Sequence, residues 1–63
     1  MREHVIRITN HADGFRVEEF SGPSLIRPVA TGQRDIGHTR MIASSTARLC
    51  GADRVDEDLT PRP

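Results

Sequence analysis

An Asp-Gly pair near the start of the chain separates two runs of residues that favour β-strands. The runs cover residues 2–9 and 15–21, and the pair is Asp13-Gly14. Glycine adopts positive φ angles at little cost, and an Asp-Gly pair between alternating apolar runs is a strong local signal for a hairpin. The sequence therefore predicts an antiparallel β-hairpin in its first third.

The loop length sets the register of this hairpin. If Asn10 lies opposite Phe15, the predicted cross-strand pairs are Ile8 with Val17, Arg7 with Glu18, Ile6 with Glu19, and Val5 with Phe20. Side chains alternate between the two faces, so one face gathers Ile6, Ile8, Phe15 and Val17. The opposite face carries the Arg7–Glu18 pair beside a smaller apolar patch. We expect the more apolar face to pack against a helix.

The segment after the hairpin has two interpretations. Gly22-Pro23-Ser24 indicates a turn, and residues 25–29 then form either a short third strand or an extended connector. Pro28 has no backbone N–H, which would restrict such a strand to the edge of a sheet.

A helical pattern covers about residues 35–50. Its apolar side is formed by Ile36, Ile42, Ala43, Ala47, Leu49 and Cys50. Thr31 or Asp35 is a candidate N-cap, and Gly51 a C-terminal stop. Because Gly37 weakens the first turn, a start as late as Thr39 is an alternative. We expect Cys50 to be a buried thiol.

The opposite side of this helix carries the candidate binding residues. Arginine and methionine are enriched at the centres of protein interfaces, and arginine suits contacts with carboxylates. The predicted protein-binding site consists of Arg34, Arg40, Met41, Ser44 and Arg48.

Residues 53–63 are acidic and contain two prolines. Such a composition is typical of a mobile, solvated segment, and the alternative is a segment that folds back onto the arginines of the helix. The expected fold is therefore α+β: a ββα or βββα domain over residues 1–52, with the hairpin packed on one amphipathic helix, followed by a flexible acidic tail over residues 53–63.

Length and composition exclude several classes of protein. The formal net charge of the chain is zero. The chain has 63 residues, which is too short for a Rossmann domain or a barrel. We therefore expect no cofactor. It lacks a long apolar stretch, so neither a membrane span nor a secretory signal is expected, and the single Cys50 suits a reducing compartment. These features favour a cytoplasmic protein.

Neither a metal site nor a catalytic site is indicated by residue spacing. The zinc-type ligands are His4, His11, His38 and Cys50, and no two of them have the short spacing that preforms a zinc site. Adjacent Glu18 and Glu19 point to opposite faces of a strand, which prevents them from acting as a catalytic pair. We expect neither a metal nor an enzyme.

The small number of apolar residues favours an association with another chain. Only 16 residues are Val, Ile, Leu, Met or Phe, and chains of this size often need a staple or a partner. We expect a homodimer, a larger homo-oligomer or an obligate partner; the alternative is a marginally stable monomer.

The hairpin-then-helix form, the small size and the lack of a catalytic constellation resemble small phage-encoded inhibitors such as anti-CRISPR proteins. This resemblance covers the architecture and no sequence motif. It agrees with a non-catalytic accessory or inhibitory factor that docks on a larger protein or nucleoprotein complex. The alternative is a small nucleic-acid-binding regulator that uses the helix arginines. Two features argue against it: the net charge is zero, and the two phenylalanines are the only aromatic residues on which bases could stack.

Overall fold

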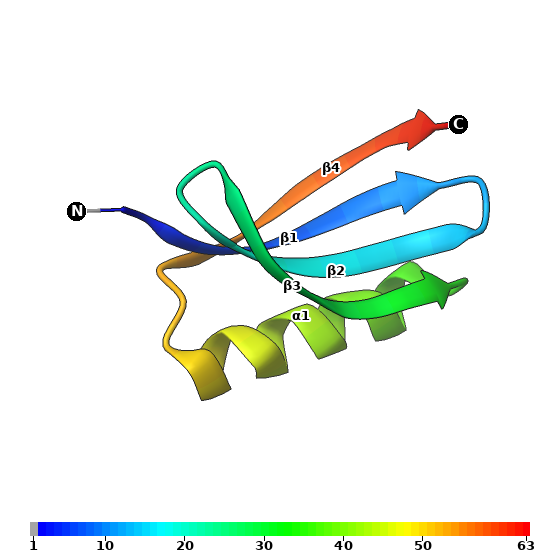
Figure 1. Cartoon of the computed structure of the whole chain (residues 1–63). Helices are drawn as coiled ribbons and strands as arrows, with labels where there is room; N and C mark the ends of the chain where they lie inside the picture. Colours follow the sequence, from blue (N-terminus) through cyan, green and yellow to red (C-terminus); the bar gives the residue numbers. More distant parts are fainter. Residues whose placement is uncertain (1) are drawn as a thin grey trace.

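The chain folds into one four-stranded sheet with a single helix on one of its faces (Figure 1). A computed structural model describes residues 2–63. The elements follow in the order β1 (His4–His11), β2 (Gly14–Ser21), β3 (Ser24–Gln33), α1 (Ile36–Cys50) and β4 (Arg54–Arg62). The strand order across the sheet is β3-β2-β1-β4. The predicted α+β class is confirmed, and the sheet has one more strand than the largest number expected.

The predicted hairpin is formed by β1 and β2. Its pairs run from His4 opposite Ser21 to His11 opposite Gly14, and every cross-strand pair predicted from the sequence is present. Gly14 has a φ of 124°. A Cβ atom at this position would lie 2.7 Å from the backbone oxygen of Gln33, so both the φ angle and the close approach of β3 require glycine.

Residues 25–29, for which a strand and an extended connector were both considered, lie within a strand that is longer than expected. β3 pairs antiparallel with β2 and forms one edge of the sheet. Pro28 lies opposite Glu18 within this pairing, which changes register at several points. An edge position tolerates a residue without a backbone N–H.

The helix begins at Ile36, earlier than the alternative start at Thr39. The side chain of Asp35 accepts a hydrogen bond of 3.1 Å from the backbone N of Gly37, which caps the N-terminus. Gly51 ends the helix in the left-handed conformation, with a φ of 70°. Of the two candidate N-caps, Asp35 is therefore the cap, whereas Thr31 lies within β3. The predicted C-terminal stop at Gly51 is confirmed. Across residues 2–63, no helix has the length and apolar character needed to cross a membrane.

The predicted flexible tail is wrong, because Arg54–Arg62 forms β4. This strand pairs parallel with β1 and places Val55 opposite Ile6. α1 carries the chain beneath the sheet from β3 at one edge to β4 at the other (Figure 1). The acidic side chains are compensated within the strand, since Arg54 pairs with Asp56 and Arg62 pairs with Asp58.

The core lies between α1 and the sheet. Its fully buried members are Ile6, Ile8, Val17 and Ala43, so the predicted apolar face of the hairpin does meet the helix. Leu49 does not join this core and is 89% exposed. At about 100° per residue, Leu49 lies roughly 120° around the helix from Ala43, which explains why its predicted packing position is wrong.

Within residues 2–63, no helix lies over the other face of the sheet. Val5 and Thr9 are nevertheless buried there. The guanidinium of Arg7 lies 4.6 Å from the centroid of the Phe20 ring, and such a contact uses the apolar stem of arginine to cover neighbouring side chains.

Candidate functional site

The outer side of α1 carries a shallow open depression of about 240 Å³. Its walls are formed by Arg40, Met41, Ser44, Ser45 and Arg48. Four of the five residues predicted for protein binding are among them, whereas Arg34 lies before the helix and outside this depression. Ser45 is the one lining residue that the sequence interpretation missed, although its position beside Ser44 was a usable signal.

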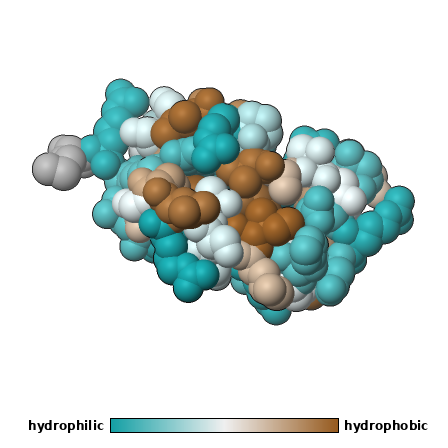
Figure 2. Space-filling model, turned by 90° about the horizontal axis from the view of Figure 1, so that it is seen from below, coloured by the Kyte–Doolittle hydropathy of each residue, from teal (hydrophilic) through white to brown (hydrophobic). Residues whose placement is uncertain are grey.

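Hydrophobic side chains reach the surface on this side of the molecule. Figure 2 views the structure from the side on which α1 lies and shows them near the middle of the face, among hydrophilic residues. Met41 is 69% exposed at the depression. A single exposed apolar side chain is ordinary, but one flanked by arginines is typical of an interface centre.

Arg40 lines this depression and also forms an ion pair that stabilises the fold. Its Nε and Nη2 atoms donate hydrogen bonds of 2.8 and 3.0 Å to the two carboxylate oxygens of Glu57 in β4. This hydrogen bond, helped by the attraction between the charges, lowers the pKa of Glu57, while partial burial opposes the shift. The pair connects α1 to β4.

Arg34 and Arg48 are exposed and form no ion pair with any residue in the range 2–63. Most of the carboxylates are already used elsewhere. Ion pairs engage Glu3, Asp13, Glu19, Asp56, Glu57 and Asp58. The side chain of Asp35 caps the helix, and that of Asp53 accepts a hydrogen bond from the backbone N of His4. The chain has no net charge, yet Arg48 on the outer side of α1 and Arg34 just before the helix keep positive charges that no ion pair neutralises.

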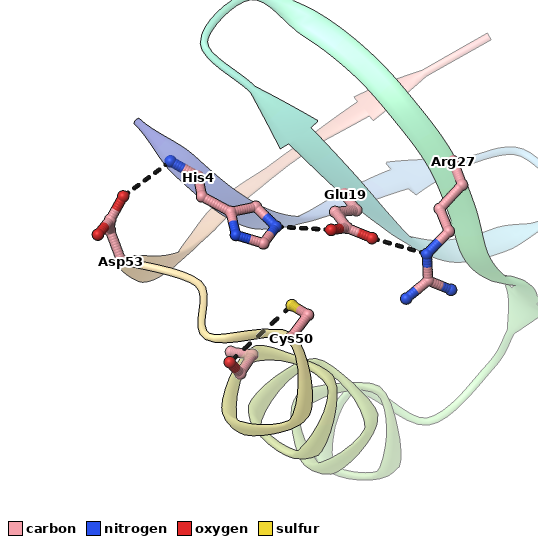
Figure 3. Close-up of polar contacts among 6 residues, drawn as sticks. His4, Glu19, Arg27, Cys50 and Asp53 are labelled. Carbon is pink, nitrogen blue, oxygen red and sulfur yellow. Dashed lines mark hydrogen bonds and ion pairs between the residues drawn. The ribbon is translucent and has the colours of Figure 1, made fainter. Parts of the chain in front are cut away.

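A second polar cluster lies near the C-terminal end of α1, on the helix-covered face of the sheet (Figure 3). The His4 Nε2 atom lies 2.6 Å from Glu19 Oε2, and Arg27 Nε donates a hydrogen bond of 2.6 Å to Glu19 Oε1. The thiol of Cys50 points toward these groups from the helix (Figure 3). Its Sγ, a His4 ring nitrogen and a Glu19 carboxylate oxygen all lie within 4.8 Å of one another.

Glu19 is a buried charge, with 7% of its surface exposed. The hydrogen bond from His4 lowers the pKa of Glu19, burial opposes this, and Arg27 lowers it further through its hydrogen bond and its charge. Glu19 is therefore ionised near neutral pH and accepts from both partners. An ionised carboxylate inside a small core is tolerated because both of its oxygens are hydrogen-bonded.

Spacing along the chain gave no sign of this cluster, because its members come from β1, β2, β3 and the end of α1. A partial signal was present in the hairpin register. Glu19 lies opposite Ile6, and His4 is two residues from Ile6, so the two side chains share one face of the sheet. The position of Cys50 depends on how α1 lies against that face, which the sequence pattern does not specify.

The comparisons with known proteins assign no family to this chain. No protein-family model matches it, and neither a curated protein nor a solved structure matches it significantly.

Proposed function

We propose that this protein is a small non-catalytic binding protein that docks, through the outer side of α1, on an acidic surface of a larger protein or nucleoprotein complex. The observation that carries the proposal is the exposed Arg48 on the outer side of α1, joined by the exposed Arg34 just before the helix; neither has a carboxylate partner among residues 2–63. The partner's carboxylates would supply the missing negative charge.

The shape of the surface supports a protein as the partner. A depression of about 240 Å³ is smaller than the roughly 300–1,000 Å³ of most small-molecule sites. It suits a side chain that projects from another protein, with Met41 supplying apolar contact and the arginines supplying charge. An accessory or inhibitory role follows from this mode of binding, because docking on a complex can block or modify one of its surfaces.

Direct binding of nucleic acid is the alternative function, and the positions of the aromatic residues disfavour it. Phe15 packs against the core, and Phe20 is covered by the guanidinium of Arg7. Neither ring offers an exposed platform on which a base could stack. The arginines of α1 alone would give weak, salt-sensitive contacts with phosphates.

The test compares what the parent protein and an Arg34→Gln/Arg48→Gln variant retain from an extract of the native host. Both arginines are exposed, and glutamine keeps good helix propensity at position 48 within α1, so the melting temperature should barely change. We expect the parent to retain a protein whose binding surface is acidic, and the variant to bind that purified protein at least tenfold more weakly. Arg2→Gln is the matched control and should bind normally, because it removes an exposed arginine that lies beside the β2–β3 turn.

Two results would contradict the proposal. One is equal affinity of the parent and the double variant for the retained protein. The other is retention that depends on nucleic acid, seen as loss of all partners after nuclease treatment together with salt-dependent binding to random duplex DNA, which would favour the alternative function.

A further inference from the structure

The cluster at the end of α1 has the ligands of a metal site. We propose that His4, Glu19 and Cys50 together bind one zinc ion, with a water molecule as the fourth ligand. The ligand atoms are a ring nitrogen of His4, a carboxylate oxygen of Glu19 and the Sγ atom of Cys50, and they already lie within 4.8 Å of one another. This site is separate from the outer side of α1 and does not depend on the binding function proposed above.

The distances require only small movements. Zinc lies about 2.0–2.2 Å from nitrogen and oxygen ligands and about 2.3 Å from sulfur, which places tetrahedral ligand atoms about 3.3–3.6 Å apart. The His4 Nε2 and Glu19 Oε2 atoms, now 2.6 Å apart, must separate by less than about 1 Å. The sulfur must approach the other two ligand atoms by about 1.2 Å at most. Two of the three side chains, those of His4 and Cys50, are only half-buried, which leaves them room to rotate.

The set of donor atoms selects the metal. Thiolate, imidazole and carboxylate are all ligands of zinc, whereas calcium and magnesium require oxygen ligands. On binding, the Cys50 thiol releases its proton to solvent, and His4 binds through Nε2 as the neutral imidazole with its proton on Nδ1. Three protein ligands and a water molecule complete a four-coordinate site. Water has access because the His4 side chain is 27% exposed.

Neighbouring groups support the ligands. Arg27 holds the Glu19 oxygen that does not face His4, and Asp53 accepts a hydrogen bond of 2.8 Å from the backbone N of His4. The Arg27 hydrogen bond is of the kind that orients a metal-binding carboxylate, and the Asp53 hydrogen bond fixes the backbone position of His4. The thiolate and the carboxylate together balance the two positive charges of zinc, so Arg27 faces a neutral centre and keeps its contact.

The site would also connect elements that the core holds weakly. It joins the start of β1, the end of β2 and the last residue of α1. The only buried apolar residues in the range 2–63 are Val5, Ile6, Ile8, Val17 and Ala43. Small domains with so little core commonly gain stability from a structural metal.

The experiment uses the full chain, stripped of metal with a chelator under reducing conditions and titrated with zinc chloride. Zinc at about a hundred times its dissociation constant should raise the melting temperature by about 10–20 °C, with one ion bound per chain. Magnesium and calcium should have no effect. Cobalt(II), which replaces zinc, should give a thiolate-to-cobalt absorption band and the visible spectrum of a tetrahedral ion.

Variants identify the ligands. Cys50→Ser keeps the shape of the side chain and should abolish both the thiolate band and the rise in melting temperature, and His4→Ala should do the same. His11→Ala and His38→Ala are the matched controls, and both should respond to zinc like the parent. The cobalt spectrum of the parent tests the site even if a variant fails to fold.

The inference is overturned by any of three results: zinc leaves the melting temperature of the parent unchanged, the cobalt complex lacks the thiolate band, or the response is lost in His11→Ala or His38→Ala and kept in Cys50→Ser.

Discussion

Glu19 shows how one side chain depends on partners from several elements. It comes from β2, receives hydrogen bonds from His4 in β1 and Arg27 in β3, and is almost completely buried. These contacts lower its pKa in the folded state relative to the ordinary value of 4.5. The unfolded chain therefore takes up a proton at a higher pH than the folded protein does, and stability must fall as the pH decreases through this range.

Acid unfolding gives the first prediction. In the parent protein, the stabilisation from Glu19 is fully present above about pH 5 and is lost as the pH falls through the lowered pKa. Glu19→Gln should reduce the free energy of unfolding by about 1–3 kcal/mol at pH 7 and by progressively less toward pH 3. Urea denaturation at a series of pH values, in the presence of a chelator, measures the free energy of unfolding of both proteins.

The control for this prediction is Glu18→Gln. Glu18 is adjacent in sequence but lies on the opposite face of β2, and it forms no ion pair with any of residues 2–63. Substitution of Glu18 should change the free energy of unfolding only slightly at every pH, so the dependence of stability on pH should have the same slope as in the parent. A parent and a Glu19→Gln variant with parallel pH profiles would show that Glu19 does not contribute to acid unfolding.

Gly14 provides the second prediction, because a side chain here meets both an unfavourable φ angle and the backbone of β3. Gly14→Val should lower the free energy of unfolding by at least about 1 kcal/mol. Gly37→Ala is the control, since Gly37 is helical and an added Cβ lies 3.5 Å from the nearest atom. That change should instead raise stability by about 0.5–1 kcal/mol. Equal denaturation midpoints for Gly14→Val and the parent would refute the role of this loop.

Among the elements, β4 is an edge strand that is held by two neighbours, β1 and α1. Within residues 2–63 it pairs with one strand, β1, and its apolar contribution comes from Val55 and Leu59, which pack against the core. Between them, Glu57 points toward the helix side and is neutralised by Arg40. The helix and the strand therefore stabilise each other across the edge of the sheet.

Truncation tests this dependence and is the third prediction. A chain ending at Asp53 loses β4 and leaves the β1 edge and part of the core exposed. We expect it to lose the cooperative thermal transition, followed by circular dichroism. A chain lacking only Pro63, which lies beyond the strand, should melt like the parent. A cooperative melt of the chain ending at Asp53 would instead support the flexible tail that the composition suggested.

Local signals predicted the first half of the fold well and the second half only in part. The hairpin register followed from Asp13-Gly14 and the alternation around it, and the helix limits followed from Asp35 and Gly51. β4 was missed because the acidic residues of this segment suggested a solvated, flexible tail rather than a strand. In fact Val55, Glu57 and Leu59 alternate with Asp56 and Asp58, which is a strand pattern. Its central Glu57 looks unsuitable until Arg40, 17 residues earlier, is known to lie beside it.

The candidate binding site was also only partly predictable from the sequence. Helical spacing correctly grouped Arg40, Met41, Ser44 and Arg48 on one surface. It did not reveal that Arg40 is paired with Glu57, because that contact depends on the unpredicted strand. The hairpin register places His4 and Glu19 on one face, but spacing could not bring Cys50 to them, because that contact forms only when the helix lies across the sheet.

For the whole molecule, the small core makes association with a second copy the expected state. β3 is an edge strand, and its Leu25 and Ile26 side chains are 51% and 53% exposed. Exposed apolar residues on a sheet edge favour pairing with another chain.

The fourth prediction follows from this edge. The melting temperature should rise with protein concentration between about 5 and 500 μM, because association stabilises the folded chain by mass action. Leu25→Thr/Ile26→Thr keeps β-forming residues in the strand and should remove this dependence. A concentration-independent melt, with light scattering that shows a monomer throughout, would contradict the prediction.

The pairing of β4 with β1 also determines when the molecule can become complete during synthesis. The ribosome releases β1 first and β4 after every other element described here, at about 5–20 residues per second. Until β4 emerges, the hydrogen-bonding groups along one side of β1 have no strand beside them. A nascent chain in this state exposes the edge of β1, which is a template on which a strand from a neighbouring chain can pair until β4 takes that place.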